Sequence, residues 1–312
     1  MARYRQQLPQ LSDDIFITDG GLETTLVFHD GLELPHFAAF DVLRQPDGAQ
    51  RMRAYFKRYI DLAKKHGVGI ILESPTWRAS ADWGRLLGYS PRELAEANRK
   101  SIALLAEMRD ALETRQSRIV ISGCLGPRGD GYNPSELLSP REAEAYHAEQ
   151  IETFSETEAD MVCAITMTHA DEAIGIVRAA TRTGMPVAVS FTVETDGRLP
   201  TGHSIKEAVE ITDAATDSAP VYYMINCAHP THFQGALATS EPWVDRIYGI
   251  RANASTCSHA ELDAADELDD GDPAALGEQY QELRKLLNSL NVLGGCCGTD
   301  HRHIAAICSA CV

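Results

Sequence analysis

Eight short apolar runs, each followed by a segment with helical periodicity, constrain the fold of this chain more than any other feature. The runs cover residues 16–21, 68–74, 119–124, 161–167, 186–193, 221–228, 246–252 and 291–295. Apolar runs of this kind are typical of parallel strands with both faces buried. Eight such units in 312 residues predict a single (β/α)8 TIM barrel domain over residues 1–312. A doubly wound open sheet is the alternative, but no glycine-rich dinucleotide fingerprint follows the first run.

The segments between these runs carry the signals that begin and end helices. Apolar side chains at helical spacing cover residues 50–66, and Gly67 ends that pattern. Ser90-Pro91 and Ser139-Pro140 predict helix starts with proline in the first turn. We expect further helices over 170–183, from Ser204, over 230–238 and 273–290, and after Asp300. The acidic stretch 261–272 predicts a solvated loop.

Composition narrows the class of function. The formal charge of −17 disfavours nucleic acid and an anionic membrane surface as partners, because binding to either requires a basic face. No apolar run is long enough to cross a bilayer, and the N-terminal residues lack the apolar centre of a signal peptide. We therefore expect a soluble cytoplasmic enzyme, in which the eight cysteines would not form a disulfide framework.

The segment Gly294-Gly295-Cys296-Cys297-Gly298 ends the eighth run with two adjacent cysteines. Adjacent side chains on a strand point to opposite faces, so two neighbouring thiols reach one point only if the strand breaks. The surrounding glycines supply the backbone freedom for such a break. Three interpretations stay open for the pair: two small buried apolar residues, a vicinal disulfide, or two thiolate ligands to one soft metal ion.

A metal site would need a third ligand, and Cys227 at the end of the sixth run is the best candidate. In a barrel of this kind chemistry lies at the carboxyl ends of the strands, and the sixth and eighth strands lie two apart. Three thiolates with an open fourth position are typical of a catalytic zinc site, which would bind a thiol and hold it as a nucleophile. No further catalytic residue is expected. His229, His301 and His303 are alternative ligands, whereas Cys124, Cys163, Cys257, Cys308 and Cys311 are interpreted as wall, loop or incidental residues.

These motifs together resemble the homocysteine S-methyltransferase family, and the resemblance covers nearly the whole chain. It rests on Asp19-Gly20-Gly21-Leu22-Glu23-Thr24-Thr25, on Asn226-Cys227, on Gly294-Gly295-Cys296-Cys297-Gly298, and on Val189-Ser190-Phe191-Thr192-Val193 with Gly197-Arg198-Leu199. The resemblance implies a (β/α)8 barrel, a Zn²⁺ ion on Cys227, Cys296 and Cys297, and methyl transfer from an onium donor such as S-methylmethionine or betaine to homocysteine, giving methionine.

The resemblance also implies substrate contacts. Asp19 would hold the amino group of the acceptor, and the backbone near Gly20 and Gly21 would approach its carboxylate. Thr166 and Asn226 would belong to the same substrate site. Glu23, Thr168 and Glu194 lie on strand-end loops, where an exposed polar role is the default for each.

Two departures from the family pattern concern recognition of the substrates. Family members commonly carry a glutamate before the threonine that corresponds to Thr166, where it binds the ammonium group of homocysteine; this chain has Ile165. Glu73 could supply the missing charge, or could be a buried glutamate paired to Arg78 or to a loop amide. Trp77 and Trp83 could enclose the cationic donor, or could simply pack as aromatic side chains.

The main hypothesis is thus a zinc-dependent methyltransferase acting on a small-molecule thiol and a methyl donor. The alternatives are a zinc enzyme with another thiol or selenol acceptor, and a thiol- or metal-binding protein without turnover. A zinc hydrolase is disfavoured, because no His-x-His pair ends the first run. The sequence leaves the donor open, together with homo-oligomerisation.

Overall fold

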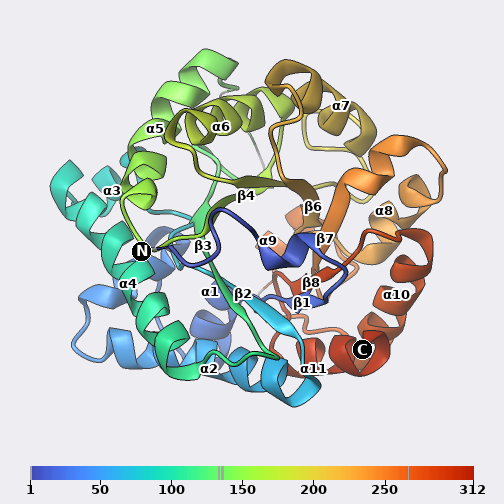
Figure 1. Ribbon diagram of the computed structural model, residues 1–312, viewed down its shortest axis with the longest axis horizontal. Helices are drawn as coiled ribbons and strands as arrows, with labels where there is room; N and C mark the ends of the chain where they lie inside the picture. Colours follow the sequence, from blue (N-terminus) through green and yellow to red (C-terminus); the bar gives the residue numbers. More distant parts are fainter. Residues whose placement is uncertain (1, 133, 135–136, 266) are drawn as a thin grey trace.

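Eight parallel strands form a closed barrel in chain order, and β8 pairs with β1 (Figure 1). The computed structural model describes residues 2–132, 134, 137–265 and 267–312. The strands are β1 (Phe16–Ile17), β2 (Gly69–Glu73), β3 (Ile119–Leu125), β4 (Met161–Met167), β5 (Val187–Phe191), β6 (Tyr222–Asn226), β7 (Ile247–Ala252) and β8 (Val292–Gly295). The predicted (β/α)8 architecture is therefore confirmed, with every strand inside a predicted run or within one residue of it.

The longer helices surround the barrel and cover the outer face of its strands, whereas the short α1 and α9 lie at the cavity (Figure 1). The helices are α1 (Leu22–Thr24), α2 (Gly48–His66), α3 (Ala81–Leu86), α4 (Pro91–Leu112), α5 (Pro140–Ser155), α6 (Ala170–Thr183), α7 (Ile205–Thr216), α8 (Pro230–Leu237), α9 (His259–Asp263), α10 (Pro273–Leu286) and α11 (His301–Cys311). A π-helix covers Thr25–His29, and short 3₁₀ segments cover Pro9–Leu11, Pro35–Phe37, Ala39–Arg44 and Pro242–Arg246. Within the described residues, no helix is both long and apolar enough to cross a membrane.

The predicted helix starts have a clear local cause. The Ser90 and Ser139 side chains each accept a hydrogen bond from the backbone N–H three residues on, while Glu93 and Glu142 bond back to the serine N–H. These reciprocal bonds satisfy backbone groups that the first turn leaves unpaired. Gly67, with φ of 68°, ends α2 in the left-handed conformation, as its position predicted.

The structure differs from the predictions at three element boundaries. β1 ends at Ile17, because the following backbone turns to bond with the end of β8 and the segment after it, as in the bonds of 2.9 Å from the Gly295 N–H to the Asp19 carbonyl and from the Gly21 N–H to the Thr299 carbonyl. α10 ends at Leu286 rather than at residue 290, since Leu287 is extended. The acidic stretch 261–272 is not entirely a solvated loop: α9 includes its first residues, and later ones line a cavity described below.

The core has two layers that position the carboxyl ends of the strands. One lies between the barrel and its helices, and the other fills the barrel interior with side chains such as Phe16, Ile71, Val120 and Met224. The N-terminal segment crosses the opposite end of the barrel, where the backbone N–H groups of Arg3 and Tyr4 donate to Asp160 (Figure 1). The barrel interior is therefore a packed core, and a cavity described below opens at its carboxyl end.

Candidate active site

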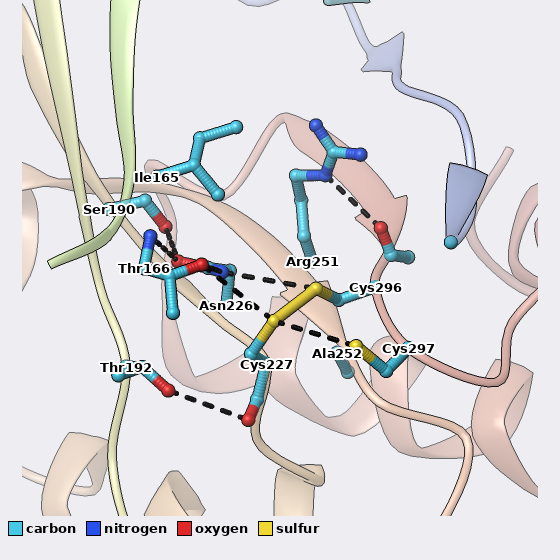
Figure 2. Close-up of a disulfide and its surroundings, with 12 residues drawn as sticks. Ile165, Thr166, Ser190, Thr192, Asn226, Cys227, Arg251, Ala252, Cys296 and Cys297 are labelled. Carbon is cyan, nitrogen blue, oxygen red and sulfur yellow. Dashed lines mark hydrogen bonds between the residues drawn. A yellow bond between two sulfur atoms is a disulfide. The ribbon is translucent and has the colours of Figure 1, made fainter. Parts of the chain in front are cut away.

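Three cysteine sulfurs meet at the carboxyl end of the barrel. Cys227 follows β6, and Cys296 and Cys297 follow β8; their Sγ atoms all lie within 4.8 Å of one another (Figure 2). The prediction that the sixth and eighth strand ends converge is thus met by the geometry. Within the described residues, this is the one group of cysteine, histidine, aspartate or glutamate side chains placed closely enough to hold a metal ion.

The break in β8 explains how adjacent cysteines reach the same place. The strand ends at Gly295, where a Cβ atom would lie 2.1 Å from the Thr299 Oγ1 atom, so only glycine fits. Gly298 has φ of +77°, a left-handed conformation that favours glycine. Between them, Cys296 is held by its N–H, which donates to the Ala252 carbonyl at 2.8 Å. The chain therefore turns within the two cysteines instead of alternating their side chains across a strand.

Cys227 reaches the cluster through an uncommon backbone conformation. Its φ is +53°, in the left-handed region that non-glycine residues rarely adopt. Its carbonyl accepts hydrogen bonds from His259 Nε2 at 2.5 Å and from Thr192 Oγ1 at 3.5 Å. These bonds hold the strained turn, so the position of the Cys227 sulfur is set by neighbouring loops as well as by β6.

Cys227 and Cys296 are joined in a disulfide in this structure, with Cα atoms 5.4 Å apart (Figure 2). Cys297 remains a free thiol, 4.0 Å from the Cys227 sulfur. The sequence interpretation did not include this pair: it expected no disulfide framework, and its disulfide alternative joined the adjacent cysteines. A disulfide and a site of three thiolates are mutually exclusive states of the same sulfurs, because metal ligation requires deprotonated thiols.

Asn226 and Thr166 form a buried hydrogen-bonded support beneath the sulfurs. The Asn226 Oδ1 atom accepts from the Thr166 N–H at 3.0 Å and from Ser190 Oγ at 2.6 Å, and its Nδ2 donates to Thr166 Oγ1 at 2.8 Å. The same Nδ2 lies 3.9 Å from the Cys296 sulfur (Figure 2). Thr166 lines the cavity, whereas the side chain of Asn226 is fully buried behind it.

Tyr132 covers the sulfurs from the loop after β3. Its hydroxyl lies 3.4 Å from the Cys227 sulfur and 3.5 Å from the Cys297 sulfur. Its ring stacks on His259 with ring centroids 4.1 Å apart, and His259 also lies 3.2 Å from the Glu194 carboxylate. The sequence analysis did not identify Tyr132, because a loop tyrosine carries no local signal of a distant sulfur cluster.

A cavity of about 460 Å³ extends from the sulfurs to the loops around the carboxyl end of the barrel. Its wall includes most of the predicted site residues: Asp19, Gly20, Gly21, Glu73, Thr166, Cys227, Cys296 and Cys297. Burial raises the pKa of the Cys297 thiol. Without a bound cation this thiol would therefore stay protonated near neutral pH.

Asp19 is buried and already paired within the protein. Its Oδ1 accepts from the Arg251 guanidinium at 2.7 Å, and its Oδ2 accepts from the Tyr55 hydroxyl at 3.0 Å. Burial raises the pKa of Asp19, although Arg251 and Tyr55 act in the opposite direction. Gly21 donates its N–H to the Thr299 carbonyl at 2.9 Å, so that amide is not free for a ligand.

Arg251 is a buried cation of the cavity wall that the sequence analysis did not identify. Its Nε donates to the Gly295 carbonyl at 3.1 Å, and its Nη2 donates to Asp19. Burial lowers its pKa, but Asp19 and Glu73 outweigh that effect, so the net direction is upward. The guanidinium is therefore charged at any physiological pH.

Glu73 is the one buried carboxylate of the wall with an unpartnered oxygen among the described residues. The side chain lies at the end of β2 and is 6% exposed, and its Oε2 atom has no hydrogen-bond partner. Burial raises the pKa of Glu73 to about 7, despite the opposing charge of Arg251. Burial likewise raises the pKa of Glu23, which lines the same cavity, to about 7.

Ile165 lines the cavity just before Thr166 and is 7% exposed. The pairing of β4 with β5 shifts register between Ala164 and Met167, and Thr166 has φ of +66°. Such an irregularity turns side chains at a strand end toward a site. An apolar side chain thus occupies the wall where the resemblance led us to look for a glutamate.

The two tryptophans after β2, Trp77 and Trp83, do not leave an open space between them for a cationic donor. The Arg78 guanidinium carbon lies 4.1 Å from the Trp77 ring centroid and 3.8 Å from the Trp83 ring centroid. The faces that a cationic donor would use are therefore occupied by a cation of the protein itself. Trp77 also donates its Nε1–H to the Ile165 carbonyl at 3.1 Å, which ties this loop to β4.

The other histidines considered as metal ligands, and the other cysteines, lie outside the sulfur cluster. His229 bonds to Thr231 at the start of α8, and His303 bonds to the Asp270 carbonyl and to Asp300 at the start of α11. His301 is exposed. Cys124 is part of the cavity wall and Cys163 is buried behind it, while Cys257, Cys308 and Cys311 lie away from the sulfur cluster.

Comparisons with known proteins agree with this geometry. The homocysteine methyltransferase MmuM from Escherichia coli matches in its oxidized form with a TM-score of 0.75 and 18% identity, over 98% of this chain and 99% of that chain. The metallated form matches with a TM-score of 0.73 and 18% identity, over 97% and 98% of the two chains. At these identities the likeness shows the fold. No curated protein matches the chain by sequence.

The family comparison covers almost the whole chain, from the first strand to the last helix. The family model described as Homocysteine S-methyltransferase matches residues 16–311, which include all three clustered cysteines. The chain is thus a methyltransferase and belongs to the homocysteine S-methyltransferase family.

Proposed function

We propose that this protein is a zinc-dependent S-methyltransferase that transfers a methyl group from an onium donor to the sulfur of homocysteine, giving methionine. The observation that carries the proposal is the convergence of three cysteine sulfurs on a cavity that also holds buried charged groups suited to an amino acid. We further propose that Cys227, Cys296 and Cys297 hold the zinc ion.

The donor set fits zinc in composition and spacing. Tetrahedral zinc binds sulfur at about 2.3 Å, which requires sulfurs roughly 3.8 Å apart. The 4.0 Å separation of the Cys227 and Cys297 sulfurs is close to that requirement. When bound, zinc would accept the sulfur of the substrate at its open fourth position and lower the pKa of that thiol. Loading requires reduction of the Cys227–Cys296 disulfide, and the E. coli relative has been described in oxidized and metallated forms.

The charged wall offers a partner for each end of an amino acid. Glu73 has an unpartnered carboxylate oxygen for the ammonium group, in place of the glutamate that Ile165 replaces. Arg251 has partners for its Nε and Nη2 atoms, which leaves Nη1 for the carboxylate of the acceptor. Asp19 would then act by orienting Arg251, while Gly20 and Gly21 allow the close approach of the ligand. Thr166 and Asn226 would position the sulfurs.

Methyl transfer requires alignment more than proton transfer. The acceptor sulfur forms a bond to the methyl carbon while the bond from that carbon to the onium nitrogen or sulfur breaks, and its electron pair returns to the donor atom. The donor leaves without its positive charge. Because the acceptor is already a thiolate at this stage, no general base is required. The residues contribute by excluding water and holding the two reacting atoms in line.

Calorimetric titration of the reduced, zinc-loaded protein with L-homocysteine tests the proposal, with zinc content measured on the same sample. We expect about one zinc per chain, saturable binding with proton release, and methionine formation when S-methylmethionine or betaine is added. A fully loaded protein that neither binds homocysteine nor forms methionine would contradict it.

A second acceptor class is favoured by one observation. Ile165 places an apolar side chain on the cavity wall, which suits a thiol or selenol that lacks an ammonium group. Competition among L-homocysteine, L-selenohomocysteine and 4-mercaptobutanoate for the loaded protein separates the two. If the protein prefers 4-mercaptobutanoate, the acceptor is a thiol that carries a carboxylate but no ammonium group, and not homocysteine.

A further inference from the structure

The described part of the chain contains three deeply buried arginines, and one of them makes no direct ion pair with a described carboxylate. Arg109 pairs with Asp160 at 2.8 Å, and Arg251 pairs with Asp19 at 2.7 Å. Arg78 is 6% exposed, yet no described carboxylate lies within 4.0 Å of its guanidinium; Asp130 and Glu23, on the same cavity wall, act on its charge only from a longer distance. A buried charge without a partner is costly, and such residues are found where a ligand supplies the missing charge.

The guanidinium of Arg78 is nevertheless held firmly. It stacks against the Trp77 and Trp83 rings, and its Nη1 donates to the Gly129 carbonyl at 2.9 Å. Its Nε atom has no hydrogen-bond partner. Burial lowers the pKa of Arg78 to about 10, so the side chain is still charged at neutral pH. With the ring contacts on its faces, the free hydrogen-bonding capacity lies along its edge, where a planar carboxylate binds.

We propose that Arg78 binds the carboxylate of the methyl donor and thereby selects donors in which the onium group and a carboxylate belong to the same molecule. Arg78 lines the cavity that contains the three sulfurs. This inference rests on the proposed methyl transfer, because it assigns a position to one of the two substrates of that reaction.

The arrangement of the wall assigns Arg78 to the donor rather than to the acceptor. The acceptor has Glu73 at the end of β2 and Arg251 near the end of β7, which both line the cavity. Arg78 lies instead on the loop beyond β2 and bonds to the loop beyond β3 at Gly129. Three residues later, that second loop places Tyr132 against the sulfurs. A donor on Arg78 would therefore lie along the wall that leads to the reacting sulfur.

Two pairs of donors test the inference on the unmodified enzyme. Each carboxylate donor is compared with its carboxamide: glycine betaine with betaine amide, and S-methyl-L-methionine with S-methyl-L-methioninamide. The amide keeps the onium group and the size but loses the negative charge. We expect at least one carboxylate to have kcat/KM about tenfold or more above its amide, as for loss of a charge-assisted hydrogen bond. Equal kcat/KM values within both pairs would overturn the inference and leave the proposed function standing.

Substitution of Arg78 locates the effect. Arg78→Gln should raise the donor KM about tenfold or more, leave the KM for homocysteine within about twofold, and abolish the preference for carboxylate over amide. Arg78→Lys keeps the charge without the planar fork and should recover part of that preference. Arg85→Gln is the matched control, because Arg85 is an exposed arginine of α3, paired only at the surface with Asp82.

A binding measurement guards against a folding defect in the Arg78 variants. Glycine betaine and S-methyl-L-methionine are titrated calorimetrically into wild type and Arg78→Gln, with thermal unfolding and zinc content recorded for both. Loss of donor binding in a folded, zinc-loaded variant supports the inference. A variant that loses homocysteine binding but keeps donor binding overturns it, since the bound carboxylate would then be that of the acceptor. An enzyme that binds and methylates from neither pair contradicts both the inference and the proposed function.

Discussion

The two ends of the cavity differ in how closely they follow the family pattern. At the sulfur end, the three cysteines that the resemblance led us to expect as metal ligands converge, placed by the backbone turns after β6 and β8. At the charged end, Ile165 stands where the resemblance led us to expect a glutamate, and Arg251 places a buried cation on the wall. The end that would carry the chemistry has the residues expected from the resemblance. The end that would recognise the substrate has a different set of charged residues.

The difference shows that two physical requirements are met separately in this barrel. A trithiolate site depends on sulfur positions within a few tenths of an ångström, so its backbone turns and glycines leave little room for change. Recognition of an amino acid requires only that opposite charges lie within reach, and any neighbouring strand end can supply them. Glu73 on β2 could thus pair with the ammonium group of the acceptor, as a glutamate at the end of β4 would from another direction.

The largest effect is expected at the sulfur end. Cys296→Ser removes one of the three proposed thiolate ligands, so zinc content and methyl transfer should both fall by more than about 100-fold. This loss exceeds the effect of removing a group that only hydrogen-bonds to a metal ligand. Metal analysis and a methionine assay under reducing conditions measure the change. Cys257→Ser, in a loop away from the cluster, should keep both. Retention of full zinc and turnover by Cys296→Ser would place the metal elsewhere.

The charged end should show the next largest effect. Glu73→Gln removes the proposed partner of the ammonium group, and homocysteine affinity at pH 8 should fall by about 10- to 100-fold, or 1.5–3 kcal/mol. Calorimetry on the zinc-loaded protein measures this loss. Glu107→Gln, an exposed glutamate of α4, is the matched control and should leave the affinity unchanged.

The pKa of Glu73 adds a pH signature to the same substitution. With a pKa of about 7 in the free protein, Glu73 is charged above pH 7 and increasingly neutral below it. The homocysteine ammonium is charged throughout this range, so wild-type affinity should rise with pH through 7. The ratio of wild-type to Glu73→Gln affinity should therefore shrink toward one at pH 5.5. A ratio that does not vary with pH would show that the charge of Glu73 is not what binds the acceptor.

A smaller effect is expected where Tyr132 contacts the sulfurs. Tyr132→Phe removes a hydroxyl placed 3.4–3.5 Å from two of them, and zinc affinity should fall by about tenfold, as for other groups that bond to metal ligands. Competition with a chelator measures the affinity directly. Tyr146→Phe, whose hydroxyl bonds to Ser80 instead, is the control. Unchanged zinc affinity in Tyr132→Phe would restrict Tyr132 to covering the cavity.

Most of the fold could be predicted because its signals are local. Apolar runs, Ser-Pro helix starts and Gly67 each act within a few residues, and the structure follows them. The early end of β1 could not be predicted, because it depends on bonds that join Asp19 and Gly21 to the end of β8 and the segment after it. The acidic stretch looked solvated for a similar reason: part of it lines the cavity, and His259 at the start of α9 bonds to the Cys227 carbonyl, far away in the chain.

The site could be predicted where a motif marks a position and could not where a role depends on a partner. The two adjacent cysteines between glycines could be identified as candidate metal ligands from the local sequence alone. Arg251 and Tyr132 did not, because their significance comes from Asp19 and from the sulfurs across the barrel. The tryptophan pair shows the same limit, since its sequence does not reveal that Arg78 already occupies the ring faces.

The smallest effect is expected from restoring the family residue. Because Glu73 already offers a carboxylate, Ile165→Glu should change homocysteine affinity by no more than about threefold, with a stability cost of about 1–3 kcal/mol from burying a second acidic group. Ile165→Met, which keeps the wall apolar, controls for packing. The double variant Ile165→Glu/Glu73→Gln separates the two positions: recovery of the affinity lost in Glu73→Gln would show that β2 and β4 are interchangeable sources of the same charge. If Ile165→Glu alone raised affinity 100-fold while Glu73→Gln had no effect, the ammonium site would belong to β4, and the wild-type protein would be adapted to an acceptor without an ammonium group.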